Sequence, residues 1–396
     1  MKNVILLILA VLLVSCNSKA EISKVKTSSK EEYKMTANNI QPFANPQLNS
    51  LIQNDLTAGG ILASKLEYNT KDIPGGPTSL LLLNDSIALI DHSIVFFVID
   101  VFNNKVIGFN KKSPNTFIIV GEQGNFYAFA SYRLLKLKLE SFREFPPKEH
   151  YFVPGLGEYS ELAVFIPKSD TYIVGTQSFG SPLDNLPVFG LLEKGYQGYK
   201  DLWNLTFDGF IPRPPVSIDG NIVVTQNNLV SIVDSNGKVK EIKTDFIPIS
   251  CSIGADNLIY MLCRVKNRTF IKAMDFDGNI HWECQTSINQ PNQPPIVSKE
   301  SMVYLIGSSK IEAFSNGEKK WEFRLTGSET EHQQASVSND GILLVSDCDK
   351  LLCINKAGKQ VWAFKVAEGE TIMTQPVLDS VGKVFIATDK KILAIK

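Results

Sequence analysis

The sequence lacks an excess of charge of either sign. It contains 40 Lys and Arg residues against 41 Asp and Glu residues, which gives a formal net charge of −1 at pH 7. Proteins that bind nucleic acid usually carry a broad basic surface that neutralises phosphates. The balance therefore argues against nucleic acid as a partner. Hydrophobic residues make up 44% of the 396 residues, which is enough for the core of one large or two medium domains.

Motifs that carry catalysis are also missing. The four histidines, His92, His150, His281 and His332, do not occur in an HExxH motif, and the chain has no GxSxG, GxxxxGK[ST] or helix-opening GxGxxG sequence. Acidic residues recur at turns between strand-like segments, where Asp and Asn stabilise the turn locally. The sequence thus predicts no catalytic residue, no cofactor and no metal site, and it favours a protein that is not an enzyme.

Cysteine is scarce. Besides Cys16 there are five cysteines, Cys251, Cys263, Cys284, Cys348 and Cys353, most of them in apolar strand-like runs. An odd number in a large domain does not indicate a disulfide framework. The absence of paired CxxC motifs argues against structural zinc. Free cysteine in such runs behaves as a small hydrophobic residue, so we expect these side chains to pack in the core.

The N-terminus indicates the compartment. Lys2 precedes the apolar run Val4–Val14, which is too short to cross a bilayer but fits the core of a signal peptide. The run leads into Leu13-Val14-Ser15-Cys16, which resembles the lipobox of bacterial lipoproteins. That resemblance implies cleavage before Cys16 and acylation of Cys16. Residues 1–15 are then the signal peptide and residues 16–56 a polar, flexible tether; an ordinary secretory signal is the alternative.

The C-terminal half repeats itself. Gly237, Gly278, Gly317 and Gly358 are 41, 39 and 41 residues apart. A Trp follows three of these glycines at the fourth position, as Trp282, Trp321 and Trp362, whereas Glu241 takes that place after Gly237. Each unit reads as four short strands joined by turns rich in Asn, Asp and Gly, which accept positive φ. A period near 40 residues with four strands per unit is typical of a β-propeller blade.

In this reading the three tryptophans are structural. They alternate with other apolar residues along the fourth strand, so Trp321, Phe323 and Leu325 share one face. A blade cannot bury both of its faces alone, and a large aromatic side chain can fill the space between neighbouring blades. We therefore predict that Trp282, Trp321 and Trp362 dock one blade onto the next.

The segments Ala273-x-Asp-x-Asp-Gly278-x-x-x-Trp282 and Ala313-x-Ser-x-Gly317-x-x-x-Trp321, with a matching segment ending at Trp362, resemble the tryptophan-docking repeat of pyrroloquinoline-quinone-type propellers. This superfamily includes quinoprotein dehydrogenases and the propeller lipoprotein of the outer-membrane barrel-assembly machine. The dehydrogenases carry adjacent cysteines and a calcium-binding set of acidic residues and Asn. This sequence has no Cys-Cys pair and no matching ligand set, so a quinone-dependent dehydrogenase is a minor alternative.

The repeat is weaker before about residue 210. Residues 78–109, 115–142 and 158–208 each read as a blade, and the last C-terminal unit lacks its outer strand. Residues 60–68 (GILASKLEY) can supply it and so close the ring with strands from both termini. The sequence therefore predicts an all-β propeller over residues 57–396, with eight four-stranded blades; seven blades is the alternative.

Binding residues are expected in loops. One face of a propeller collects the turns between second and third strands together with the connections between blades, and function often lies in such loops. The candidate partner-binding residues are Arg213, Asn228, Arg264, Lys266, Arg268, Asp347 and Asp349. The sequence predicts a lipid-anchored scaffold for protein interaction or assembly in the cell envelope, at the outer membrane, on its periplasmic or its surface side. A surface glycan-binding or sensing lipoprotein is the alternative.

Overall fold

The computed structural model describes the following residues: 55–67, 76–82, 85–92, 95–111, 117–120, 125–130, 133–138, 150–152, 162–166, 171–175, 185–193, 199–208, 214–217, 219–326 and 333–396. All of them belong to one compact unit, Lys34–Lys396. Cys16, the expected signal peptide and Arg213 lie outside these ranges. Between residues 109 and 208 the strands are described but, apart from Trp203, Leu205 and Phe207, their side chains are not.

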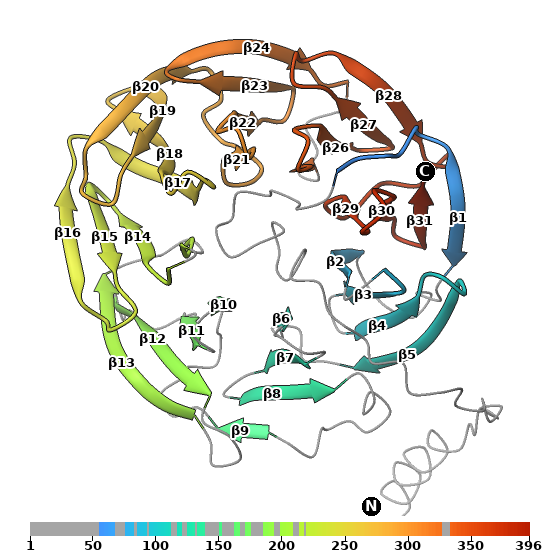
Figure 1. Ribbon diagram of the computed structural model, residues 1–396, viewed down its shortest axis with the longest axis horizontal. Coiled ribbons are helices and arrows are strands. Elements are labelled where there is room, and N and C mark those ends of the chain that lie inside the picture. The colour runs from blue at the N-terminus through green and yellow to red at the C-terminus, as the bar shows by residue number, and fades with distance from the viewer. Residues whose placement is uncertain are drawn as a thin grey trace, which may run out of the picture. The chain divides into compact units, whose positions relative to one another are not determined.

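The described residues form antiparallel strands and turns (Figure 1). Four sheets lie in the N-terminal half or join the two ends of the chain. They are β2 (Pro77–Leu82), β3 (Ile87–His92), β4 (Val95–Asp100) and β5 (Lys105–Lys111); β6 (Phe117–Val120), β7 (Asn125–Ala130), β8 (Arg133–Lys138) and β9 (His150–Phe152); β10 (Leu162–Ile166), β11 (Thr171–Gly175), β12 (Asn185–Glu193) and β13 (Tyr199–Asp208); and β1 (Leu62–Glu67) with β29 (Val377–Leu378), β30 (Val384–Ala387) and β31 (Lys391–Ile395).

The other four sheets follow one another in the C-terminal half. They are β14 (Ile222–Gln226), β15 (Leu229–Val233) and β16 (Val239–Lys243); β17 (Ile247–Ile253), β18 (Ile259–Val265), β19 (Arg268–Met274) and β20 (Ile280–Thr286); β21 (Ile296–Val297), β22 (Val303–Ile306), β23 (Lys310–Ser315) and β24 (Glu318–Arg324); and β25 (Gln334–Val337), β26 (Leu343–Asp347), β27 (Lys350–Ile354) and β28 (Gln360–Lys365).

These sheets confirm, for the described residues, the prediction of an all-β chain built from four-stranded antiparallel units. The exception is the β14–β16 sheet: of the first strand expected at residues 216–218, the described residues form one isolated bridge, between Val216 and Ile222. The described part contains no α-helix, so no helix there is long and apolar enough to span a bilayer.

The two ends of the chain share one sheet. Strand β1 pairs antiparallel with β31, from Leu62 opposite Ile395 to Glu67 opposite Lys391. It thereby takes the outer position in the sheet that the C-terminus leaves with three strands. Figure 1 shows β1 beside β31, between β28 and β5. Hydrogen bonding of β1 covers the edge of β31, which would otherwise be an open template for another chain.

The hydrophobic core lies between neighbouring sheets. We call the sheet of β1, β29, β30 and β31 the closing sheet. One cluster joins Leu344 and Leu351 of the β25–β28 sheet to Ile386 and Ile395 of the closing sheet, and it includes Ala58. Four further clusters likewise span the boundary between consecutive sheets from β14 to β28 and between the closing sheet and β2–β5. Second and third strands are therefore buried on both faces, while outer strands such as β28 alternate exposed and half-buried residues.

The half-buried outer-strand tryptophans lie at these boundaries, each against a glycine of the next sheet. Trp321 packs on Gly358, and its indole Nε1 donates a hydrogen bond to the Lys356 carbonyl at 2.8 Å. Trp203 makes the same pair of contacts with Gly237 and the Ser235 carbonyl, and Trp282 packs on Gly317. Each of these glycines has positive φ, a conformation that glycine adopts without strain.

The contact between Trp321 and Gly358 can be tested with a matched pair of variants. Gly358 and Gly369 have nearly equal φ values of 75° and 76°. A Cβ atom at Gly358 would lie 2.6 Å from Trp321 Cδ2, whereas one at Gly369 would meet nothing within 4 Å. We expect Gly369→Ala to lower the free energy of unfolding by about 1 kcal/mol through backbone strain alone.

Gly358→Ala should lower the free energy of unfolding by ~1–3 kcal/mol more than Gly369→Ala, because its added methyl group also overpacks the contact with Trp321. Urea unfolding of both variants measures the difference. Equal losses in the two variants would contradict the packing role of Gly358.

Candidate functional site

The turns of each sheet fall into two sets at opposite ends of its strands. Hydrogen bonds join like turns of neighbouring sheets: Ser301 donates to Asp256 between two turns that link first and second strands, and the backbone N–H of Ser380 donates to Asp85 in the same way. We call the end with the first-to-second and third-to-fourth turns the hairpin face. The end with the second-to-third turns and the connections between sheets is the connector face.

Three of the expected binding residues lie together on the connector face. Arg264, Lys266 and Arg268 occupy the tight turn between β18 and β19, and all three are exposed. We call residues 264–268 the basic hairpin. No ion pair is found for these three side chains among the described residues. Asn267 is exposed beside them, so the hairpin offers three cations and an amide to an incoming group.

The connector of residues 287–295 lies next to this hairpin. Thr269, which directly follows the basic hairpin, donates from its hydroxyl to Asn289 Oδ1 at 2.6 Å. Further along, Asn292 Nδ2 donates to Gln333 Oε1 at 3.0 Å. The buried Gln293 side chain clamps Ala335 of β25: its Nε2 donates to the Ala335 carbonyl at 3.0 Å, and its Oε1 accepts from the Ala335 N–H at 2.7 Å. The connector is thus held to two neighbouring sheets.

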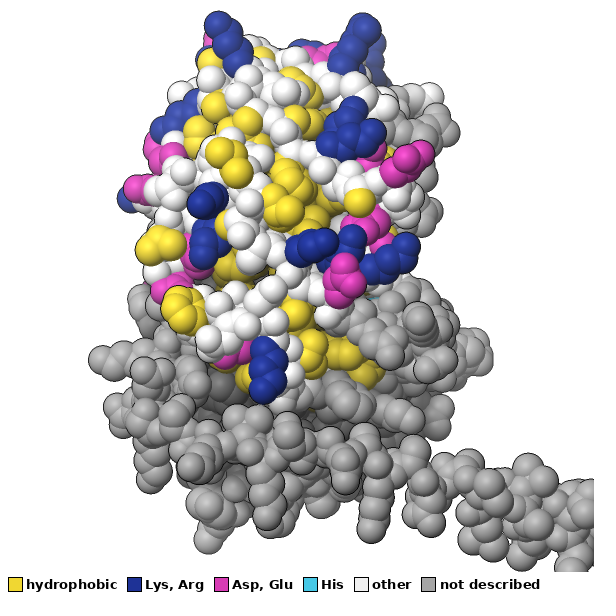
Figure 2. Space-filling view, turned by 90° about the vertical axis from the view of Figure 1, so that its right-hand side faces the viewer, with side chains coloured by type: hydrophobic (Ala, Val, Ile, Leu, Met, Phe, Trp, Pro, Cys, Tyr) yellow, Lys and Arg dark blue, Asp and Glu magenta, His cyan; other side chains and the backbone are white. Residues whose placement is uncertain are grey.

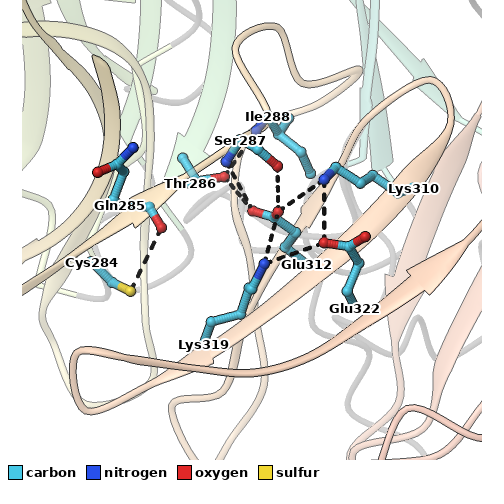
Figure 3. A network of polar contacts seen from close by, with 9 residues as sticks. All are labelled: Cys284, Gln285, Thr286, Ser287, Ile288, Lys310, Glu312, Lys319 and Glu322. Atoms are coloured by element: carbon cyan, nitrogen blue, oxygen red, sulfur yellow. Dashed lines mark hydrogen bonds and ion pairs between the residues drawn. The ribbon is translucent and has the colours of Figure 1, made fainter.

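A buried carboxylate fixes the start of the connector (Figure 3). Glu312 on β23 is fully buried and accepts from the hydroxyls of Thr286 at 2.5 Å and Ser287 at 2.6 Å, and from the Ser287 N–H at 3.3 Å. Lys310 and Lys319 lie 3.2 and 3.4 Å from the same carboxylate. Charged donors and hydroxyl donors together satisfy the negative charge at the boundary between two sheets.

These contacts determine the ionisation of Glu312. Burial alone raises the pKa of a carboxyl group, but hydrogen bonds from Ser287, Thr286 and Lys310, with the charge of Lys319, outweigh it and lower the pKa of Glu312 from 4.5 to about 2. The same two lysines also pair with Glu322 and lower its pKa. Glu312 and Glu322 are therefore ionised at neutral pH, and the hydrogen bonds to Glu312 keep residues 286–288 in place.

The remaining expected residues do not join the basic hairpin. Asn228 is exposed at the turn between β14 and β15, in the preceding sheet. Asp349 is half-exposed and pairs with Lys365 at 3.1 Å. Asp347 is a correction: it is buried, and its carboxylate accepts from the N–H of Thr326 and from Gln333 Nε2, so it is not available to a partner.

Glu312 and its neighbours were not expected from the sequence. Glu312 lies in a third strand that is buried on both faces. A single Glu in such an apolar strand does not indicate by itself that a polar network forms there. Alignment of the repeats would have shown it: Lys272, Glu312 and Leu352 each precede the residue that pairs with the docking Trp. A charged residue in two units where another has Leu indicates a polar seam at those two boundaries.

The described residues contain no group of three or more His, Cys, Asp or Glu side chains that could hold a metal ion. Burial raises the pKa of the Cys251 and Cys353 thiols to about 12, so neither is ionised at neutral pH. The described part of the connector face presents amides and hydroxyls beside the three cations of the basic hairpin.

No model of a known protein family matches the sequence, and no curated protein matches it. Solved structures do match. Sqt1 of Saccharomyces cerevisiae aligns with a TM-score of 0.57 at 12% identity, over 91% of this chain and 99% of that one. Virginiamycin B lyase of Staphylococcus aureus aligns with a TM-score of 0.50 at 14% identity, over 84% of this chain and 98% of that one. A streptogramin B lyase aligns with a TM-score of 0.50 at 12% identity, over 84% and 97%.

These are propeller-like proteins, and the chain shares their fold. The comparison corrects one expectation from the sequence. The absence of catalytic motifs favoured a protein that is not an enzyme, but the fold of this chain also occurs in lyases. A propeller builds its sites from loops of several blades, so the linear motifs of other folds are a poor test for catalysis here.

The acid sensitivity of the Glu312 network is a testable consequence of its geometry. A folded-state pKa below the unfolded value means that the charged network stabilises the fold above about pH 4.5, and that this contribution is lost as the pH falls toward 2. We expect Glu312→Gln to lower the free energy of unfolding at pH 7 by on the order of 3 kcal/mol, and to flatten the pH dependence between 4.5 and 2.

Glu318→Gln is the control, because Glu318 is exposed and pairs only with Lys320 among the described residues. Glu318→Gln should leave the free energy of unfolding and its pH dependence nearly unchanged, because ion pairs exposed to solvent contribute little. Urea unfolding between pH 2 and pH 7 measures both variants. An unchanged pH profile in Glu312→Gln would refute the assigned role.

Proposed function

We propose that the protein is a lipid-anchored propeller of the bacterial cell envelope that binds a protein partner through its connector face. Sequence and structure support different parts of this proposal. The lipobox-like Leu13–Cys16 sequence supports the anchor, at the outer membrane. The eight sheets and the pairing of β1 with β31 support an eight-bladed ring closed by both termini. The seams between Trp and Gly support the relation to pyrroloquinoline-quinone-type propellers.

The binding proposal rests on one observation: the basic hairpin lies next to the connector of residues 287–295, which hydrogen bonds hold in place. The side chains of Arg264, Lys266 and Arg268 are exposed around one turn. None of them forms an ion pair within the described part of the chain. The connector beside them is held by Glu312, Gln333 and Ala335, so its exposed Asn289 and Gln290 lose little conformational entropy on binding. Such a surface suits a partner with acidic side chains.

The anchor is tested first. Cys16→Ser should move the protein from the membrane fraction to the soluble envelope fraction, because two or more acyl chains are what hold a protein stably on a bilayer. Cys284→Ser makes the same chemical change at a half-buried site and should leave the protein on the membrane. Mass spectrometry of the membrane form should show the added acyl chains. Retention of the Cys16→Ser protein, with no acyl mass on the unaltered protein, would refute the anchor.

The binding surface is tested by charge reversal. A variant with Arg264→Glu, Lys266→Glu and Arg268→Glu should lose partner co-purification from crosslinked membranes by about tenfold, equivalent to ~1.4 kcal/mol. The control reverses three exposed lysines near the hairpin face: Lys238, Lys299 and Lys320. Full co-purification by the first variant would contradict the proposal. Loss of retention on a polysaccharide column, with protein partners unchanged, would assign the surface to an acidic glycan.

A further inference from the structure

Exposed apolar side chains are unevenly distributed over the described residues. Eight large hydrophobic side chains are exposed there, and seven of them lie in hairpin-face turns or near the starts of outer strands, which begin at that face. Six belong to the closing sheet and its two neighbours, and we call these the apolar rim: Ile61, Leu62, Phe102, Ile107, Val361 and Val381. Ile247, at the start of β17, is the one at the connector end.

The segments that carry the rim residues contact one another across the three sheets. Trp362 of β28 packs on Gly60, immediately before Ile61 and Leu62. Asn104, in the turn that also carries Phe102, donates from its side chain to the Lys65 carbonyl of β1 at 2.7 Å. Figure 2 looks onto the side of the molecule that carries β1 in Figure 1 and shows hydrophobic side chains among Lys, Arg, Asp and Glu side chains. Phe102 is 81% exposed and Val381 64%, and large apolar side chains that are exposed in one region of a surface often mark an interaction site.

The N-terminal segment enters the fold at the same face. The Leu56 N–H donates to Asp340 Oδ1 at 3.2 Å, and Asn339 Nδ2 donates to Asp55 Oδ1 at 2.8 Å. The Thr57 N–H and hydroxyl donate to the carbonyls of Gly382 and Val381, at 3.2 and 2.5 Å. These partners are hairpin-face turns of two neighbouring sheets. The chain that leads back to Cys16 therefore leaves the fold beside Val381, within the apolar rim.

We propose that the apolar rim rests on the lipid bilayer to which Cys16 is anchored. This inference builds on the proposed anchor. The sequence predicts a flexible tether over residues 16–56, of which Asp55 and Leu56 are held by the fold. If the residues before Asp55 form that tether, a coil of this length has a mean end-to-end distance of roughly 35 Å, so the hairpin face is held near the membrane. Lys65, Lys105 and Lys359 are exposed among the rim residues. Their aliphatic stems can lie along apolar surface while the ammonium groups reach lipid phosphates.

Contact with the bilayer directs the opposite end of the fold away from it. The basic hairpin of residues 264–268 lies on the connector face, at the other ends of the strands. Rim contact at the hairpin face therefore leaves Arg264, Lys266 and Arg268 free for a partner and keeps them from anionic headgroups.

The test uses the acylated, full-length mature protein in phosphatidylcholine–phosphatidylglycerol vesicles with brominated acyl chains. Phe102→Trp and Ile247→Trp each place one new indole at an exposed hydrophobic position, one in the rim and one at the connector end. The emission of the unaltered protein is subtracted as background. Brominated lipid should reduce the added emission of Phe102→Trp at least twofold relative to plain lipid, and it should leave the added emission of Ile247→Trp unchanged.

The possible failures are distinguishable. Acylated protein in which Phe102→Trp is not quenched, or in which both variants are quenched equally, overturns the rim contact and leaves the anchor intact. Absence of acyl chains in the mass spectrum overturns the anchor, and the rim contact with it. A concentration-dependent dimer that Phe102→Asp abolishes would overturn the proposal by assigning the rim to a second copy of the chain.

Discussion

The fold depends on the contact between an outer-strand side chain and a turn glycine of the next sheet. Each sheet is thin and apolar on both faces, so it is stable only against its neighbours. At the seams of Trp203, Trp321 and Trp362, the indole N–H donates to the carbonyl two residues before the glycine, which belongs to Ser235, Lys356 and Ala58. The indole ring of the Trp then covers the glycine. One aromatic residue thus satisfies a turn carbonyl and fills the gap between two sheets.

The seam after β16 meets the same requirement without a tryptophan. Glu241 occupies the expected Trp position, and its neighbours Lys240 and Ile242 each make one of the two contacts that a Trp makes at the other seams. Lys240 Nζ donates to the Phe276 carbonyl at 3.1 Å, which is the carbonyl two residues before Gly278. Ile242 supplies the apolar contact to that glycine, with Cγ2 3.0 Å from the position of a Cβ atom. An ammonium group and an aliphatic side chain together replace one indole.

That substitution shows how far the sequence could predict the fold. The period of Gly and Trp, the alternation along outer strands and the turns rich in Asn and Gly were sufficient to predict four-stranded antiparallel units. They could not reveal the role of Lys240, because its partner carbonyl lies 36 residues away in sequence, on another sheet. The first strand expected at residues 216–218 was overestimated, because its described residues form a single bridge, between Val216 and Ile222.

The candidate site was less predictable than the fold. Polarity close to a turn suggested exposure for both Arg264 and Asp347, yet only the first is exposed. The difference comes from the connection between β24 and β25. Its residues Thr326 and Gln333 cover Asp347 and donate hydrogen bonds to both oxygens of its carboxylate. Arg264 lies on a longer hairpin beyond such cover. Burial by a distant loop, like the buried charge of Glu312, depends on tertiary contacts that local sequence does not specify.

The face at which the N-terminal segment enters the fold follows from the direction of strand β1. An outer strand is the fourth in its sheet and runs from the hairpin face to the connector face. Since β1 serves as a fourth strand against β31, whatever precedes it must enter at the hairpin face. Had the N-terminal segment supplied the innermost strand instead, it would have entered at the connector face, where the basic hairpin lies. Adding β1 to the last sheet from outside therefore does two things: it covers the edge of β31, and it separates the face at which the N-terminal segment enters the fold from the face that carries Arg264, Lys266 and Arg268.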